Sequence, residues 1–144
     1  MGVGIEGVVG PVFWEPRATE KGIDSSWTMS LLLDRVIPEL QTWLNSELLI
    51  FQQDGARPHS SDMVMGLLND TFPNRVIANG TQSHPAPIAW PPRSPDLTLC
   101  DYFLWGWMKG RIFHRDQPPR TLGELRAAIE EGDEELSQNR ALRE

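Results

Sequence analysis

The stretch Trp90-Pro91-Pro92-Arg93-Ser94-Pro95-Asp96-Leu97 decides how the middle of this sequence folds. Each of its three prolines fixes its own φ and biases the residue before it toward extended geometry. Ser94-Pro95-Asp96 then has the pattern of an N-cap, a first helical residue and a first-turn acid. The stretch therefore predicts a rigid extended strap that leads into a helix over residues 96–113. That helix carries Asp101.

Length and composition indicate a globular protein. The 144 residues, 40% of them hydrophobic, suit one domain with its own core, and we expect a single domain over residues 1–144. The one cysteine, Cys100, cannot form an internal disulfide, so we expect an intracellular, reducing compartment. No apolar run approaches the roughly 20 residues of a membrane span, and no signal segment opens the sequence. We therefore expect no membrane association.

Charge is unevenly distributed along the sequence. The net charge is −7, but residues 57–120 hold seven basic and five acidic groups, and both flanking parts are acidic. An acidic chain is a poor duplex binder by counterion release alone. Charge by itself therefore favours solvated surface for residues 57–120 over a nucleic-acid footprint.

The order of the expected elements predicts a mixed α/β layer domain. Apolar runs of period two or of helical period, with their turn and cap residues, define the elements. The first elements are a hairpin over 3–14 with its turn at Gly7 and a helix over 26–44 that Pro38 kinks or splits. A strand over 48–51 that is buried on both faces, a helix over 60–70, a strand over 75–78 and a loop over 79–89 follow. The strap with its helix comes next, and a last acidic helix follows the capping box of Thr121 and Glu124.

Two acids are candidates for chemistry. Asp54 follows the buried strand, and chemistry in open α/β sheets gathers at the carboxyl ends of strands. Taken alone, however, Asp54-Gly55 reads more simply as a turn. Asp101 shares a predicted inward stripe with Leu104 and Met108, where an acid needs a partner or a metal. Asp96 lies about 140° away around the helix and is better explained as a helix N-terminal acid.

Other site chemistries are disfavoured. The three histidines and the cysteine match no zinc-ligand spacing, and neighbouring residues on one turn cannot form a Ser-His-Asp triad. No glycine-rich phosphate loop is present, so we expect no small-molecule cofactor. The residues weighed in these alternatives are His59, Ser60, Asp62, His84, Cys100 and His114.

Five segments together resemble the catalytic domain of mariner-like transposases. The strap is the most specific match, whereas the hairpin is a weak one. The matching segments are 8–14, 51–59, 72–75, 87–98 and 101–106.

The resemblance implies a ribonuclease-H-like fold, which is a mixed five-stranded sheet flanked by helices. It also implies three acids that hold two divalent cations, Mg²⁺ or Mn²⁺, for DNA strand cleavage and transfer. The second acid falls on Asp54 and the third on Asp101. The first belongs to a strand upstream of the hairpin, for which this sequence has no counterpart. We therefore expect an incomplete fold with the first strand missing, weak or lost cation binding, and an inactive enzyme.

This sequence departs from the family in further ways. The helix-turn-helix domain that recognises transposon ends has no counterpart. Leu99 and Arg57 stand where the family commonly has proline, and residues 79–86 form extra loop. Without the first strand, the sheet has unpaired edges. Either the hairpin pairs directly with residues 48–51 or the chain stays loosely packed, and we expect low stability or self-association.

The resemblance implies that the partner is DNA and that the protein acts in the nucleus. A homodimer is the further partner that we consider. The candidate nucleic-acid contacts are Arg57, His59, Arg93, Lys109 and Arg111. In a second interpretation the chain is a captured non-enzymatic domain that binds nucleic acid or dimerises. Its phosphate contacts would include Arg115, and the two acids would be incidental. A general ribonuclease-H-like nuclease is disfavoured because it would also need the first acid.

Overall fold

The computed structural model describes residues 1–4, 7–15, 22–92 and 94–138. They form two compact units, of which the first joins Met1–Phe13 to the chain from Pro95 onward and the second is Trp14–Ser94. The boundary between the units therefore falls inside the strap, between Ser94 and Pro95. Each unit is described by itself below, and the single domain stays a prediction. Arg93 lies outside the described residues.

The second unit contains a small parallel sheet, and the fold is mixed α/β as predicted. Strands β3 (Phe51–Gln52), β4 (Val76–Ala78) and β5 (Ile88–Ala89) pair in that order, both pairs parallel. Helix α3 (Asp62–Thr71) connects β3 to β4, as a parallel pair requires. The Trp90 N–H donates to the Ala78 carbonyl at 2.9 Å, so the start of the strap is bound to the sheet.

A π-helical stretch interrupts the long helix predicted over residues 26–44. Helix α1 (Ser25–Leu31) begins at the N-cap Asp24, whose carboxylate accepts from the Trp27 N–H at 3.0 Å. A π-helical stretch, Leu32–Val36, separates α1 from α2 (Ile37–Gln41). Pro38 lies in the first turn of α2, where its missing N–H costs least.

The core of the second unit lies between α3, the sheet and the helices from residue 25 onward. Phe51 and Phe72 stack with ring centroids 5.2 Å apart at the edge of this cluster. Val64, Met65, Leu68, Val76 and Ala78 are fully buried, and Leu32 and Ile37 complete the cluster.

The buried strand predicted over residues 48–51 is wrong in its extent and burial. Residues Ser46–Leu48 form a 3₁₀ turn, and β3 is only two residues long. Leu48 and Ile50 are 70% and 59% exposed. The reason is that Leu48 belongs to the 3₁₀ turn and Ile50 precedes β3, so neither residue is part of the strand that pairs in the sheet.

The first unit begins with a hairpin that is shorter than the one predicted over residues 3–14. Strands β1 (Gly2–Val3) and β2 (Val8–Val9) pair antiparallel, with Gly2 opposite Val9, in a sheet of their own. The Gly4 N–H donates to the Gly7 carbonyl at 2.8 Å across the turn. β2 ends before Gly10, whose φ of +123° suits glycine, and Pro11 follows it.

The helix predicted over residues 96–113 starts irregularly. A 3₁₀ turn, Pro95–Leu97, and a π-helical stretch, Cys100–Leu104, precede the regular helix α4 (Trp105–Phe113). Ser94 directly precedes the 3₁₀ turn, and its hydroxyl donates to the Pro92 carbonyl at 3.4 Å. Its role as an N-cap stays a prediction.

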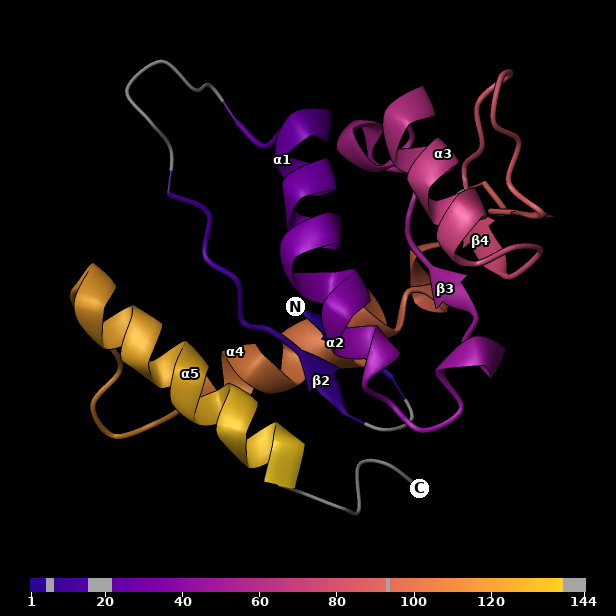
Figure 1. Ribbon diagram of the computed structural model, residues 1–144. Coiled ribbons are helices and arrows are strands. Elements are labelled where there is room, and N and C mark those ends of the chain that lie inside the picture. Colours follow the sequence, from indigo (N-terminus) through magenta and orange to yellow (C-terminus); the bar gives the residue numbers. More distant parts are fainter. Residues whose placement is uncertain (5–6, 16–21, 93, 139–144) are drawn as a thin grey trace. The chain divides into compact units, whose positions relative to one another are not determined.

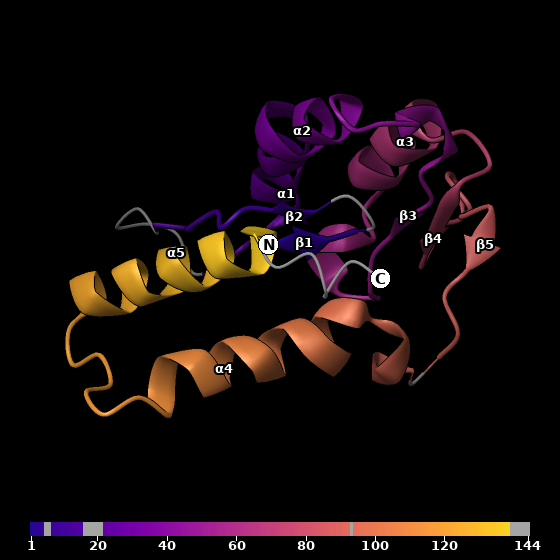
Figure 2. The same cartoon turned by 90° about the horizontal axis from the view of Figure 1, so that it is seen from below.

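Helix α5 (Leu122–Gln138) packs along α4, as Figure 2 shows. The predicted capping box is confirmed: the Glu124 N–H donates to the Thr121 hydroxyl at 3.2 Å, and the Thr121 N–H donates to the Glu124 carboxylate at 3.3 Å. A Cβ added at Gly132 would lie 2.7 Å from the Met108 sulfur, so the helices approach closely there. The core of this unit is Leu104, Met108, Ile112, Ala128 and Leu136.

Within the described ranges, no helix combines the length and the apolar character that crossing a membrane requires.

Candidate functional site

Asp54 lies in a tight turn at the carboxyl end of β3. Its Oδ1 accepts a hydrogen bond from the Ala56 N–H at 3.1 Å, which is the local bond expected of an aspartate in a turn. Gly55 stands where an added Cβ would collide with the Asn79 amide, so the turn lies against the residue that follows β4. The turn interpretation and the strand-end interpretation of Asp54 therefore both apply.

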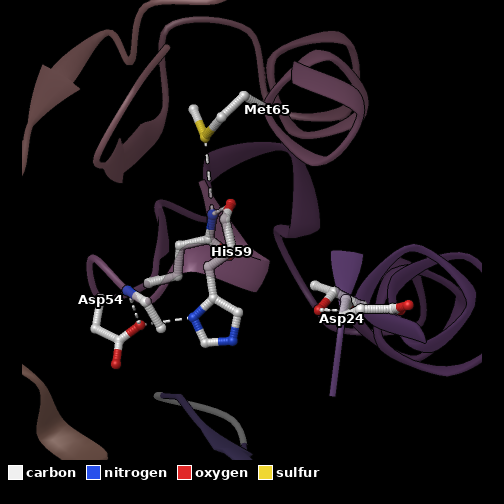
Figure 3. A network of polar contacts seen from close by, with 7 residues as sticks. Asp24, Asp54, His59 and Met65 are labelled. Carbon is white, nitrogen blue, oxygen red and sulfur yellow. Dashed lines mark hydrogen bonds and ion pairs between the residues drawn. The ribbon is translucent and has the colours of Figure 1, made fainter. Parts of the chain in front are cut away.

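His59 contacts the same carboxylate oxygen. Its Nδ1 lies 2.6 Å from Asp54 Oδ1, and the two side chains are 37% and 41% exposed. The ring projects from a 3₁₀ turn, Arg57–His59, that follows the Asp54 turn directly. Figure 3 shows the imidazole and the carboxylate facing each other. One oxygen of Asp54 thus has two partners, one from the backbone and one from a side chain.

Gln53 fastens the turn to the core of its unit. Its side-chain amide donates to the His59 carbonyl at 2.8 Å and contacts the Met65 sulfur at 3.7 Å. The Gln53 N–H donates to the Ile77 carbonyl at 3.1 Å, which continues the pairing of β3 with β4 past the end of the strand. Because Met65 is fully buried, the turn that carries Asp54 and His59 is tied to the core rather than held only by solvent-exposed bonds.

The second oxygen of Asp54 fits a divalent cation. A carboxylate oxygen is the ligand type that Mg²⁺ and Mn²⁺ prefer, and no hydrogen bond within the described residues involves Oδ2. One carboxylate supplies one ligand, however. Among the described residues, no three His, Cys, Asp or Glu side chains gather as a metal site. The turn therefore fits one ligand of a cation site and does not by itself make a two-metal centre.

Asp101 differs from its predicted placement. It is exposed, so the predicted inward face for this acid is wrong, although Leu104 and Met108 of the same stripe are buried. The cause is the π-helical stretch Cys100–Leu104, in which i→i+5 hydrogen bonds replace i→i+4 bonds. The rotation per residue then differs from the 100° of an α-helix, from which the inward stripe was predicted. Asp54 and Asp101 belong to different units, so their convergence on one cation stays a prediction.

The residues predicted to contact nucleic acid differ in whether their side chains form ion pairs within the protein. Arg57 and Lys109 are exposed, whereas Arg111 forms an ion pair with Glu135 of α5. Arg115 likewise pairs with Glu131, at 3.1 Å, and donates to the Arg111 carbonyl. Acidic residues of α5 therefore balance the charges of Arg111 and Arg115.

A second polar cluster lies on the loop that the sequence marks only as extra residues. The Thr81 hydroxyl donates to the Asp62 carboxylate, and this bond is the main reason why the pKa of Asp62 is below its ordinary value. His84 Nδ1 lies 3.7 Å from the same carboxylate, and the Asn69 amide donates to the Pro85 carbonyl at 3.1 Å. The cluster holds the loop against α3. The dipeptide Asn79-Gly80 indicates a turn at the start of this loop.

Neither the models of known protein families, nor the curated proteins, nor the solved structures include a match to this chain.

Proposed function

We propose that this chain is part of the catalytic domain of a mariner-like DNA transposase, with a ribonuclease-H-like fold and a nuclear site of action. The strap and the segments around Asp54 and Asp101 support the family. The parallel pairing of β3 with β4 through α3 supports the fold. The observation that carries the proposal is Asp54 at the carboxyl end of a parallel strand, with one oxygen bonded and the other open to a cation.

In the proposed site, the chain's own carboxylates bind the cations and fix their positions. Asp54 would offer Oδ2 to a cation, and Asp101 would supply the second carboxylate. Two bound divalent cations would activate the attacking oxygen and stabilise the leaving oxygen of an in-line displacement. Because these 144 residues hold two of the three acids that the family uses, we propose that the chain by itself does not cleave DNA.

The convergence of the two acids is tested with Mn²⁺ on the whole chain. A cation held by both carboxylates broadens the amide NMR signals of residues near Asp54 and of residues near Asp101. Asp54→Asn should remove both effects, whereas Asp96→Asn serves as the matched control and should leave both. Broadening near Asp54 without any near Asp101 would show that the acids do not share a cation and would contradict the proposal.

Activity is tested on the same protein. We expect no strand cleavage or joining of DNA by the purified chain with Mg²⁺ or Mn²⁺. Cleavage that Asp54→Ala abolishes would contradict the proposed inactivity while supporting the transposase family.

A captured, non-enzymatic domain is the second candidate. The observation in its favour is that both contacts to Asp54 Oδ1 come from the protein, which gives the acid a structural role without a metal. Such a domain binds DNA through phosphate contacts, so its affinity falls with salt and survives the double change Asp54→Asn and Asp101→Asn. Loss of DNA binding in the double variant would count against it.

A further inference from the structure

We propose that His59 is a positioning residue for Asp54: its Nδ1–H holds Asp54 Oδ1, so that Oδ2 is the oxygen offered to a cation. The hydrogen-bond part of this proposal stands on the geometry of the turn. Only its last clause, on the cation, rests on the proposed function.

The direction of the hydrogen bond fixes the tautomer of the imidazole. An ionised carboxylate only accepts hydrogen bonds, so at 2.6 Å from Asp54 Oδ1 the donor must be His59 Nδ1. A neutral imidazole carries a single N–H. The neutral His59 ring is therefore protonated at Nδ1, and its Nε2 carries a lone pair.

The backbone of His59 is held independently of Asp54. The His59 N–H donates to the Ala56 carbonyl at 2.9 Å, and the His59 carbonyl accepts from the Gln53 side chain at 2.8 Å. Pro58, which precedes His59 in the same 3₁₀ turn, has its own φ fixed by its ring. The backbone that carries the ring is thus held without any contribution from the Asp54 side chain.

The same tautomer argues against the predicted role of His59 as a phosphate contact. A phosphate oxygen needs a hydrogen-bond donor, and the neutral Nδ1–H ring has already used its one donor on Asp54. Carboxylates that bind metals are themselves commonly hydrogen-bonded by a neighbouring side chain, which fixes their orientation. His59 has the position and the donor for that role.

The tautomer is measured by long-range ¹H–¹⁵N NMR on the histidine rings of the whole chain, at about pH 8.5, where an ordinary imidazole is neutral. We expect the Nδ1-protonated pattern for His59. Asp54→Ala should change that pattern, and the exposed His114 serves as the internal reference. An Nε2-protonated His59 in the unmodified chain would overturn the proposal.

The effect on the cation is measured by Mn²⁺ titration of the same chain. His59→Leu should weaken Mn²⁺ binding at Asp54 by about tenfold. His59→Asn, whose amide can donate from nearly the position of Nδ1, should restore most of it. His114→Leu is the matched control and should change nothing. The amide spectrum of each variant reports whether it folds.

The outcomes separate the two proposals. Wild-type affinity in folded His59→Leu would overturn the positioning of Oδ2 and leave the proposed function standing. No Mn²⁺ near Asp54 in the unmodified chain would contradict the cation site at this acid, and the tautomer alone would then decide the role of His59.

Discussion

The turn at Asp54 and the π-helical stretch at Asp101 carry the two candidate acids, and they are built in opposite ways. Asp54 is half-buried, and its Oδ1 has two hydrogen-bond donors in a turn tied to buried Met65 through Gln53. Asp101 is exposed on a π-helical stretch. The comparison teaches that neighbouring groups can fix the orientation of a carboxylate before a ligand binds, as at Asp54. At an exposed carboxylate such as Asp101, the ligand itself would have to fix that orientation.

Glycines near each acid should give the largest difference between the two regions. Gly80 follows Asn79, which lies against the Asp54 turn, and a Cβ at Gly80 would meet the backbone of Pro85 and Ala86. We expect Gly80→Ala to destabilise the second unit by about 2 kcal/mol, because backbone cannot give way easily. Gly106→Ala, near Asp101, should stabilise α4 by about 0.5–1 kcal/mol, since nothing lies within 4 Å of the added Cβ.

Amide hydrogen exchange in α3 and in α4 would measure the two effects separately. Equal protection in α3 with and without Gly80→Ala would mean that the loop over residues 79–87 is not bound to its unit as described.

Removing each acid should give the next largest difference. Asp54→Ala deletes the acceptor of the Ala56 N–H and of His59 Nδ1, and at this exposure we expect a loss of about 1 kcal/mol. Asp101→Ala should stay within about 0.5 kcal/mol of the unmodified chain, as exposed substitutions generally do. Chemical denaturation of the two variants compares them directly, and a larger loss for Asp101→Ala would reverse the contrast.

Acid dependence should separate two other carboxyls, one in each unit. The Thr81 hydroxyl is the main cause of a pKa of Asp62 below the ordinary value of 3.8. The contribution of Asp62 to stability is therefore present above 3.8 and is lost as the pH falls through its folded pKa. Burial raises the pKa of Asp133, so its contribution is full below 3.8 and is lost as the pH rises through its folded pKa.

Variants of these two carboxyls should consequently change stability in opposite directions. At neutral pH, we expect Asp62→Asn to destabilise its unit and Asp133→Asn to stabilise the other. Denaturation of each variant at pH values from acid to neutral measures both. Parallel pH profiles for the unmodified chain and Asp62→Asn would show that Thr81 does not hold the Asp62 carboxylate.

Elements with local signals were predictable from the sequence. The capping box of Thr121 and Glu124 closes within four residues, so its pattern alone located the start of α5. The apolar spacing of α3 and the short apolar run of β4 were likewise sufficient. The strand β5 was not, because Ile88 stands among prolines and its pairing with Ile77 depends on how the loop between them folds.

The candidate site was predictable only in part for the same reason. Sequence placed Asp54 at the end of a strand, since a strand and a turn are local features. It did not predict the contact of His59 with the Asp54 carboxylate, because that contact depends on how two successive turns fold back. The phosphate contact of His59 stays a prediction. The exposure of Asp101 also escaped prediction, since no residue pattern marks the change from i→i+4 to i→i+5 bonding.

The close approach of Met108 to Gly132 has a consequence for chemical ageing of the protein. The sulfur fills the space that a side chain at position 132 would need, and Met108 is buried. Conversion to the sulfoxide would add a polar oxygen where α4 and α5 touch. An oxidant that reached this thioether would therefore force the two helices apart, and once the helices had separated, reductive repair could reach the same atom.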